Sequence, residues 1–308
     1  MKVVSYLKSV PANHSPSMKT ELLINFIEGV NASGDTGIVS NNLTIADSEV
    51  AVIQGWIYQN ISSPHLQLRN KIIQTQFAAN RYTVSADANL FLYNDKTNPH
   101  GYLRYSFNGI FPTTGIYCDT IVDTSRWQQI SKDTNIKLEN IKQTGQTILV
   151  LLQRNKGWSM DGKDVLEWTI DTISNIRQHT DRPILIRVHP GDKTSRTYIP
   201  ILRRSLSKIK NVSISNIGTT LQEDLIDAWA VVNHNSSAAV GPIIQGYHCF
   251  LTDPKSSQNA EVSNTDFRLI ESPLEFDRQK WLERISMFHW KFSELKDGSC
   301  WKHMREFI

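Results

Sequence analysis

The chain has 308 residues, of which 33 are lysine or arginine and 30 are aspartate or glutamate, and 40% of its residues are hydrophobic. This composition is that of an ordinary folded protein and excludes a disordered, collagen-like or coiled-coil chain. The formal net charge of +3 permits a polyanionic partner without requiring one. At roughly 150 residues per domain, the length predicts two domains or one large one.

The sequence has few features that indicate a cellular location or a disulfide framework. No apolar run approaches the ~18 residues of a membrane span, and the chain starts with a short apolar burst rather than the core of a signal peptide. Cys118, Cys249 and Cys300 have neither metal-site spacing nor the even number of a disulfide framework. We therefore expect a cytoplasmic protein without a membrane span or a bound metal.

The first half mixes strand and helix signals. We expect a strand at 2–7, a helix from Met18 to Val30 where apolar residues recur at helical spacing, and a buried strand at 51–56. A polar helix at 62–76 and strands at 81–86 and 89–93 follow. Gly34 and Gly37 predict a turn, and residues 99–126 read as a loop. The polar stretch 131–146 predicts a domain boundary, so the first domain is expected to cover 1–140.

Strand and helix signals alternate regularly in the second half. Strands are expected at 147–152, 183–188, 211–215, 229–233 and 248–251, with helices at 164–179, at 198–209, after Thr220 and across Pro242. Thr220 and Glu223 have the spacing of a capping box. Alternating strands and crossover helices predict a parallel sheet, so 141–275 is expected to be a Rossmann-like domain. Residues 276–308 are expected to form a long amphipathic helix that packs back on the body.

Polar residues follow four of these strands, at the edge where parallel sheets bind ligands. They are Gln153 and Arg154, Arg187 and His189, Asn235 with Ser236 and Ser237, and Asp253. Hydroxyls and N–H groups at a helix start favour an anion, so Ser236 and Ser237 predict a phosphate site. Arg154, Arg187 and Lys193 would add positive charge. A plain N-cap at Ser236 and a turn at His189-Pro190 fit the same residues.

Three segments carry a resemblance to a known family: LLQRNKGWSMDGKDVLEW, TDRPILIRVHPGD and LIDAWAVVNHNSSAAVGPIIQGYHCFLTD. They resemble the C-terminal half of GT-B glycosyltransferases related to the capsular-polysaccharide Kdo transferases, especially their small phage-encoded, DNA-modifying relatives. The resemblance implies an α/β fold of two Rossmann-like domains facing a cleft, with a UDP- or CMP-linked sugar held by the second. Gly246-Tyr247-His248-Cys249 stands where the family has a Gly-x-Pro segment.

The resemblance also implies roles for single residues. His189 would approach the nucleotide phosphate or ribose, Ser236 and Ser237 would hold the diphosphate, and Gln153 and Arg154 would line the donor pocket. Arg187, Asn235 and Asp253 complete the expected donor set.

The first half resembles the same group through YLRYSFNGIFPTTGIYCD and DTSRWQQI. An inverting enzyme needs a general base, for which Asp87 is the first candidate and His14 and His100 the next; each also fits as an ordinary loop residue. Arg104 and Asn108 are expected to contact the acceptor. Because no D-x-D triplet, P-loop or G-x-G-x-x-G is present, we expect a metal-independent enzyme.

Two acceptors are open. The phage-like resemblance and the basic stretch containing Arg203 and Arg204 favour a hydroxymethylated pyrimidine in DNA, with those arginines on backbone phosphates. A solvated helix face fits the same stretch. The second acceptor is a growing surface glycan in the cytoplasm. A non-catalytic module that binds nucleotide sugars is a third hypothesis from a different functional class.

Overall fold

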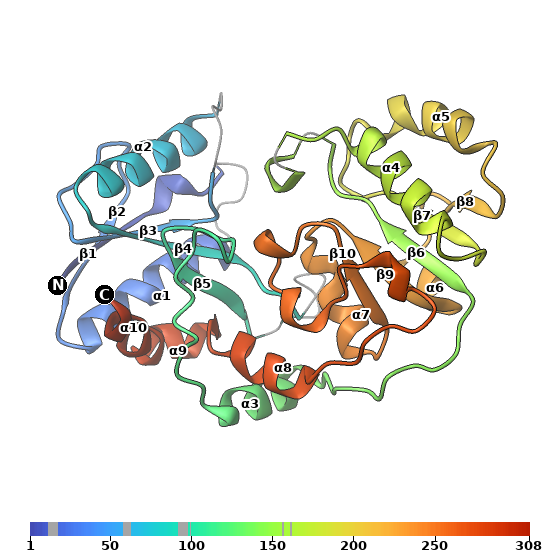
Figure 1. The fold of residues 1–308 in the computed structure, drawn as a ribbon. Helices are drawn as coiled ribbons and strands as arrows, with labels where there is room; N and C mark the ends of the chain where they lie inside the picture. The colour runs from blue at the N-terminus through green and yellow to red at the C-terminus, as the bar shows by residue number, and fades with distance from the viewer. Residues whose placement is uncertain (12–17, 58–62, 92–97, 99, 156, 161) are drawn as a thin grey trace. The chain divides into compact units, whose positions relative to one another are not determined.

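The computed structural model of the chain describes residues 1–11, 18–57, 63–91, 98, 100–155, 157–160 and 162–308. The chain forms two compact units, one made of Met1–Ile136 together with Leu282–Ile308 and the other of Lys137–Trp281 (Figure 1). The sequence suggested divisions after residues 140 and 275. In the structure, residues 282–308 belong to the first unit, so the N-terminal unit is built from both ends of the chain.

The first unit contains a six-stranded sheet in the order β11-β5-β4-β3-β1-β2. Its strands are β1 (Lys2–Tyr6), β2 (Thr36–Ser40), β3 (Val50–Gln54), β4 (Tyr82–Ala88), β5 (Leu103–Phe107) and β11 (His289–Trp290). The four strands from β2 to β4 are parallel, whereas β5 is antiparallel to β4 and β11 is antiparallel to β5. The carboxyl ends of β1, β3 and β4 therefore share one edge of this sheet.

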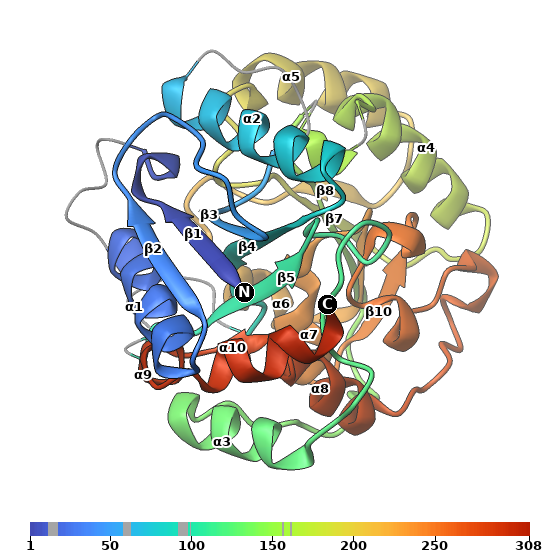
Figure 2. The same cartoon turned by 90° about the vertical axis from the view of Figure 1, so that its left-hand side faces the viewer.

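Helices cover both faces of the first sheet, which explains why β1, β3, β4 and β5 are buried at most of their positions. The described α-helices of this unit are α1 (Met18–Ala32), α2 (Pro64–Ala78), α3 (Thr124–Thr134), α9 (Phe292–Lys296), α10 (Ser299–Met304) and the last five residues of α8 (Arg278–Ser286). Val3 and Val52 pack in one core with Phe26 of α1 and Trp301 of α10. The neighbouring positions on the strands, such as Val4 and Ile53, point the other way and pack against α2, which lies across the opposite face (Figure 2).

The second unit contains a five-stranded parallel sheet in the order β10-β9-β6-β7-β8. Its strands are β6 (Thr147–Leu151), β7 (Ile184–Arg187), β8 (Val212–Ile214), β9 (Ala228–Asn233) and β10 (His248–Leu251), and its helices are α4 (Val165–Arg177), α5 (Ser195–Leu206), α6 (Leu221–Leu225) and α7 (Val240–Ile244). The capping box predicted at Thr220 and Glu223 is present at the start of α6. The parallel sheet predicted for this part of the chain is confirmed.

Three local predictions in the first unit are wrong. The predicted turn around Gly37 contains β2, and the predicted loop 99–126 contains β5 and the start of α3. Asn89, Leu90 and Phe91 are not in a strand, although a strand was expected from 89 to 93; residues 92 and 93 lie outside the described part. Strand pairing at the ends of a sheet is decided by distant partners rather than by local propensity.

The predicted long C-terminal helix is also wrong. Helix α8 (Arg278–Ser286) ends before Met287, and the two-residue strand β11 then pairs with β5. Two short helices, α9 and α10, follow. Pro242 is the third residue of α7, so it stands in the first turn of a helix of five residues rather than kinking a longer one.

The longest helices that the structure describes, α1 and α2, have 15 residues each. None of the described helices is both long enough and apolar enough to cross a membrane.

Candidate active site

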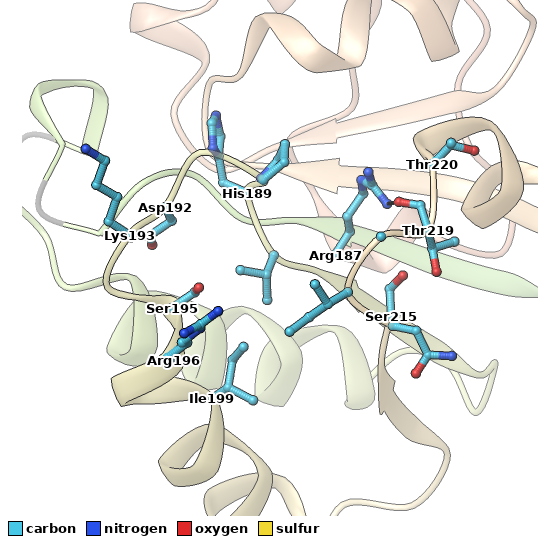
Figure 3. A pocket seen from close by; sticks show the side chains of 15 residues that line it. Arg187, His189, Asp192, Lys193, Ser195, Arg196, Ile199, Ser215, Thr219 and Thr220 are labelled. Carbon is cyan, nitrogen blue, oxygen red and sulfur yellow. Dashed lines mark hydrogen bonds between the residues drawn. The ribbon is translucent and has the colours of Figure 1, made fainter.

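A pocket of about 700 Å³ lies in the second unit at the carboxyl ends of β7 and β8 (Figure 3). It is lined by residues of the segment 187–199, which follows β7, and of the segment 215–220, which follows β8. In Figure 3, Lys193, Ser195 and Arg196 lie at the left of the pocket, and Arg187 and Thr219 lie at the right. This is the edge at which the sequence predicted ligand binding.

Arg187 is fixed on the pocket wall by a buried carboxylate. Its Nη1 donates to the Thr219 carbonyl at 2.8 Å and to Asp224 Oδ2 at 2.5 Å, and Ser215 Oγ donates to the same carboxylate at 2.8 Å. Asp224 therefore neutralises most of the charge that Arg187 was expected to offer to a diphosphate. The remaining N–H groups of Arg187 can still donate to a ligand in the pocket.

His189 is held in one tautomer. Its Nδ1 accepts a hydrogen bond from the Gly191 backbone N–H at 2.9 Å, so in the neutral ring Nε2 carries the proton. Burial and the nearby charge of Arg154 lower the pKa of His189 below its usual value, against the opposing effect of Asp192. At neutral pH the side chain is thus a hydrogen-bond donor through Nε2. A donor of this kind suits a phosphate oxygen or a ribose hydroxyl.

Asp192 ties the loops after β6 and β7 together. Its carboxylate accepts hydrogen bonds from the backbone N–H of Asn155, from the N–H and hydroxyl of Thr194, and from the hydroxyl of Tyr198. Burial alone would raise the pKa of Asp192, but these hydrogen bonds lower it below its usual value. The carboxylate stays ionised while it orders the loop that carries His189.

Three cations remain available near the pocket. No ion pair joins Arg154, Lys193 or Arg196 to a carboxylate of the described residues. Gly191 leaves room for the Arg154 guanidinium, because a Cβ at Gly191 would stand 2.7 Å from Arg154 Nη2. The pocket side of the sheet edge is therefore positively charged and favours an anionic ligand.

A second cluster lies at the carboxyl ends of β6, β9 and β10. Gln153 Nε2 donates to Asn235 Oδ1 at 2.8 Å, and Asn235 Nδ2 donates to Asp253 Oδ2 at 3.0 Å and to the Ser159 carbonyl at 2.9 Å. Gln153 and Asn235 are both buried. The two side chains therefore satisfy each other's hydrogen bonds and are buried rather than open to a ligand.

The two serines differ in their surroundings. Ser236 Oγ accepts the Ala238 N–H at 3.1 Å and caps the short 3-10 helix Ser237–Ala239, while the Ser236 N–H donates to Asn233 Oδ1. The Ser237 side chain is exposed. Ser236 therefore has the N-cap role that the sequence left open, and the Ser237 hydroxyl is the one available to a ligand.

The expected donor residues come together along one edge. The strand order β10-β9-β6-β7 puts Asp253, the two serines, Arg154 and His189 at successive strand ends. Sequence reasoning missed Asp192, Ser215 and Asp224 as the groups that hold this edge in place. The Asp-x-Thr spacing of Asp192 and Thr194, typical of an Asx turn, was the available signal.

Among the residues expected on the acceptor side, the structure brings Asp87 and Arg104 together and places Asn108 apart from them. Asp87 lies within β4, not after it, and its Oδ2 accepts from Arg104 Nη2 at 2.6 Å. His100 is exposed in a turn, and His14 lies outside the described residues. Asn108 exchanges hydrogen bonds with the backbone of Thr83, at the amino end of β4 and thus at the opposite edge from Asp87.

Arg203 and Arg204 are in the last turn of α5. The helix starts beside the pocket at Ser195 and has 12 residues, a length of about 18 Å, so both arginines are near the amino ends of the strands. They are expected to contribute little to a ligand at the carboxyl edge.

No protein-family model matches the chain, and no curated protein matches it in sequence. Solved structures do match in fold. The KpsC β-Kdo 2,7-transferase of Thermosulfurimonas dismutans has a TM-score of 0.54 at 11% identity, covering 98% of this chain and 100% of that one. The β-Kdo 2,4-transferase of the same organism has a TM-score of 0.53 at 12% identity, covering 94% and 90%. The fold is GT-B.

The GT-B assignment confirms the fold class predicted from the sequence, because each unit of the chain is a mainly parallel sheet with helices on its faces. Among the described residues, no group of three or more histidine, cysteine, aspartate or glutamate side chains is arranged to hold a metal ion.

Proposed function

We propose that the chain is a glycosyltransferase that moves a sugar from a nucleotide-sugar donor to an acceptor hydroxyl. The observation that carries the proposal is the pocket at β7 and β8, where His189 is fixed as a donor and Lys193 and Arg196 are lining residues. The Arg154 guanidinium lies close by at Gly191, and none of the three cations is in an ion pair with a carboxylate of the described residues. Its volume of about 700 Å³ is within the usual range for small-molecule sites.

The donor is proposed to bind along the carboxyl edge of the second sheet. The nucleoside would occupy the pocket, and the phosphate groups would extend past His189 and Arg154 towards Ser237. UDP- and CMP-linked sugars both fit this arrangement. Gln153, Asn235 and Asp253 act by holding the loop of Ser236 and Ser237 in place.

The reaction needs a proton acceptor and a way to stabilise the departing phosphate. The acceptor oxygen attacks the anomeric carbon, the bond from that carbon to the phosphate breaks, and a base removes the hydroxyl proton. We propose Asp87 for the base if the reaction inverts configuration. The cations and N–H groups around the pocket would stabilise the phosphate without a metal ion.

The acceptor is proposed to bind to the first unit. A hydroxymethylated pyrimidine in DNA was favoured from the phage-like resemblance and from the basic stretch, but Arg203 and Arg204 belong to the second unit and lie at the far end of α5. Their position removes the support that the basic stretch gave to DNA, and we favour a glycan hydroxyl. We place the enzyme in the cytoplasm because all three cysteines are buried and free, as in proteins of a reducing compartment.

Calorimetry of the full chain with UDP and with CMP tests the donor proposal. We expect one of them to bind, and Arg154→Gln to weaken binding about tenfold. Arg268→Gln is the matched control, since Arg268 is an exposed arginine of the same unit, paired with Asp266. A wild-type chain that binds no nucleotide or nucleotide sugar overturns the proposal.

Mass spectrometry then identifies the acceptor, with hydroxymethylcytosine DNA and glycans incubated with the donor that binds. Sugar found on DNA would restore the DNA hypothesis. Donor binding with neither transfer nor hydrolysis would instead identify a non-catalytic module.

A further inference from the structure

Arg69 is a buried cation at the carboxyl edge of the first sheet. It lies in the second turn of α2, and only 7% of the residue is exposed. Its Nε donates to the Ser9 carbonyl at 2.8 Å, and its Nη2 donates to Gln54 Oε1 at 2.9 Å. Both oxygens are neutral, so these bonds orient the guanidinium without balancing its charge.

The third nitrogen of this guanidinium, Nη1, lies beside Gly55. A Cβ at Gly55 would stand 2.9 Å from Nη1, and the φ of +73° at this position is one that glycine adopts without strain. Nη1 makes no hydrogen bond within the described part of the chain. The guanidinium therefore packs directly against the glycine backbone at the end of β3, and its Nη1 hydrogens are unused by the described residues.

The charge around Arg69 is not balanced within the described residues. Asp87 is the carboxylate that acts on it, and burial outweighs that attraction, lowering the pKa of Arg69 to about 10. The same carboxylate is already hydrogen-bonded to Arg104 at 2.6 Å. Asp87 thus hydrogen-bonds one guanidinium and attracts a second. A buried charge without a full partner is costly, and an anionic ligand would remove that cost.

We propose that Arg69 is the binding site for a single oxyanion, a carboxylate or a phosphate monoester, carried by a small acceptor. This inference rests on the proposed glycosyltransferase function and names the class of acceptor. A small glycan suits the site because one buried guanidinium can hold one anion. A polyanion such as DNA would need a row of exposed cations.

Three model acceptors test the inference on the full chain: methyl β-glucuronide, methyl glucoside 6-phosphate and the neutral methyl β-glucoside. Binding is followed by NMR titration. We expect at least one charged compound to bind about tenfold or more tightly than the neutral one, and Arg69→Gln to abolish this preference. The compound that binds more tightly distinguishes the carboxylate from the phosphate.

Two further variants guard the result. Arg69→Lys keeps the charge but loses the hydrogen bond to Ser9 or to Gln54, so it should retain part of the preference for charged compounds. If Arg69→Gln does not fold, the reduced preference of Arg69→Lys is the test instead. Arg81→Gln removes a more exposed arginine of the same unit, which pairs with Asp47, and should leave the preference unchanged.

Equal binding of charged and neutral compounds, no binding of either charged compound, or a preference that survives Arg69→Gln would overturn the inference. Salt-dependent binding of duplex DNA that does not require Arg69 would also contradict it. Nucleotide affinity is measured on the same samples. If the wild type binds a nucleotide but shows no oxyanion preference, this inference alone fails, whereas loss of nucleotide binding is a failure of the proposed function.

Discussion

Arg104 and Asp87 face each other across β5 and β4, and their side chains are joined by a 2.6 Å hydrogen bond. The pair is mostly buried, with 11% of the arginine side chain and 22% of the aspartate side chain exposed. A cross-strand ion pair of this kind orients the carboxylate at the edge of the sheet while leaving part of it accessible.

Asp87→Asn tests the base. The amide keeps the shape but cannot accept the hydroxyl proton, so turnover should fall by ~10²–10⁴-fold while nucleotide affinity stays the same. Steady-state kinetics and calorimetry on the same protein measure both. Asp47→Asn, which removes an exposed carboxylate paired with Arg81, is the control. Near wild-type turnover would move the base to His14 or His100, or indicate a retaining mechanism.

The two serines after β9 should respond differently to removal of the hydroxyl. Ser237→Ala should weaken nucleotide binding about tenfold and leave stability unchanged, because the side chain is exposed. Ser236→Ala should lower stability by ~1 kcal/mol through loss of the cap. Calorimetry and chemical denaturation separate the two effects. If Ser237→Ala binds the nucleotide like wild type, Ser237 has no role at the phosphate.

Gly191→Ala should displace the Arg154 guanidinium. A Cβ at this position meets Arg154 Nη2 at 2.7 Å, and the flexible arginine can move away. We expect an affinity loss similar to that of Arg154→Gln, and a double variant no weaker than either single one. Additive losses in this double-mutant cycle would show that Gly191 acts independently of Arg154.

Chelation tests the role of metal. If cationic side chains and N–H groups stabilise the departing phosphate, activity should survive EDTA, and Arg154→Gln should lower it with or without the chelator. Complete inhibition that Mg²⁺ reverses would contradict metal independence.

His289 should make the protein sensitive to acid. Its Nε2 accepts the Leu90 N–H, its Nδ1 is 2.7 Å from the Ile285 carbonyl, and burial lowers its pKa to about 3. The unfolded chain binds a proton below pH ~6.5 and the folded chain does not. On account of this residue, the free energy of unfolding should therefore fall by ~1.4 kcal/mol for each pH unit as the pH is lowered from ~6.5 to about 3.

Chemical denaturation from pH 7.5 to pH 5 checks this prediction. His289→Gln should be less stable at pH 7.5 but should lose less stability on acidification than wild type does. His179→Gln, at a partly exposed position of the second unit, should keep the wild-type slope. Equal slopes in wild type and His289→Gln would show that His289 is protonated in the folded state.

The second unit could be predicted well because its signals are local. Strands β9 and β10 are short runs that are buried at every position, and the capping residues Thr220 and Glu223 mark the start of α6. The first unit depends more on distant partners. β11 has only two residues, too few for any periodicity, and it becomes a strand because β5 offers an unpaired edge.

The same distinction applies to the site. Strand ends indicated where Arg154, His189 and Ser237 lie, since sheet topology alone brings them to one edge. The sequence could not predict which polar side chains would hydrogen-bond to each other instead of to a ligand. Gln153 and Asn235 are 82 residues apart in the chain, and only the folded arrangement shows that each satisfies the other.

The return of the chain to the first unit after Trp281 affects the order in which the protein can be assembled. During synthesis, every residue of the second unit leaves the ribosome before β11 does, and β11 forms the edge of the first sheet. Domains of a chain usually fold from the N-terminus onward. In this protein the first unit, which contains the N-terminus, is completed after the second unit. A nascent chain that still lacks β11 would therefore contain all residues of the second unit but only part of the first sheet.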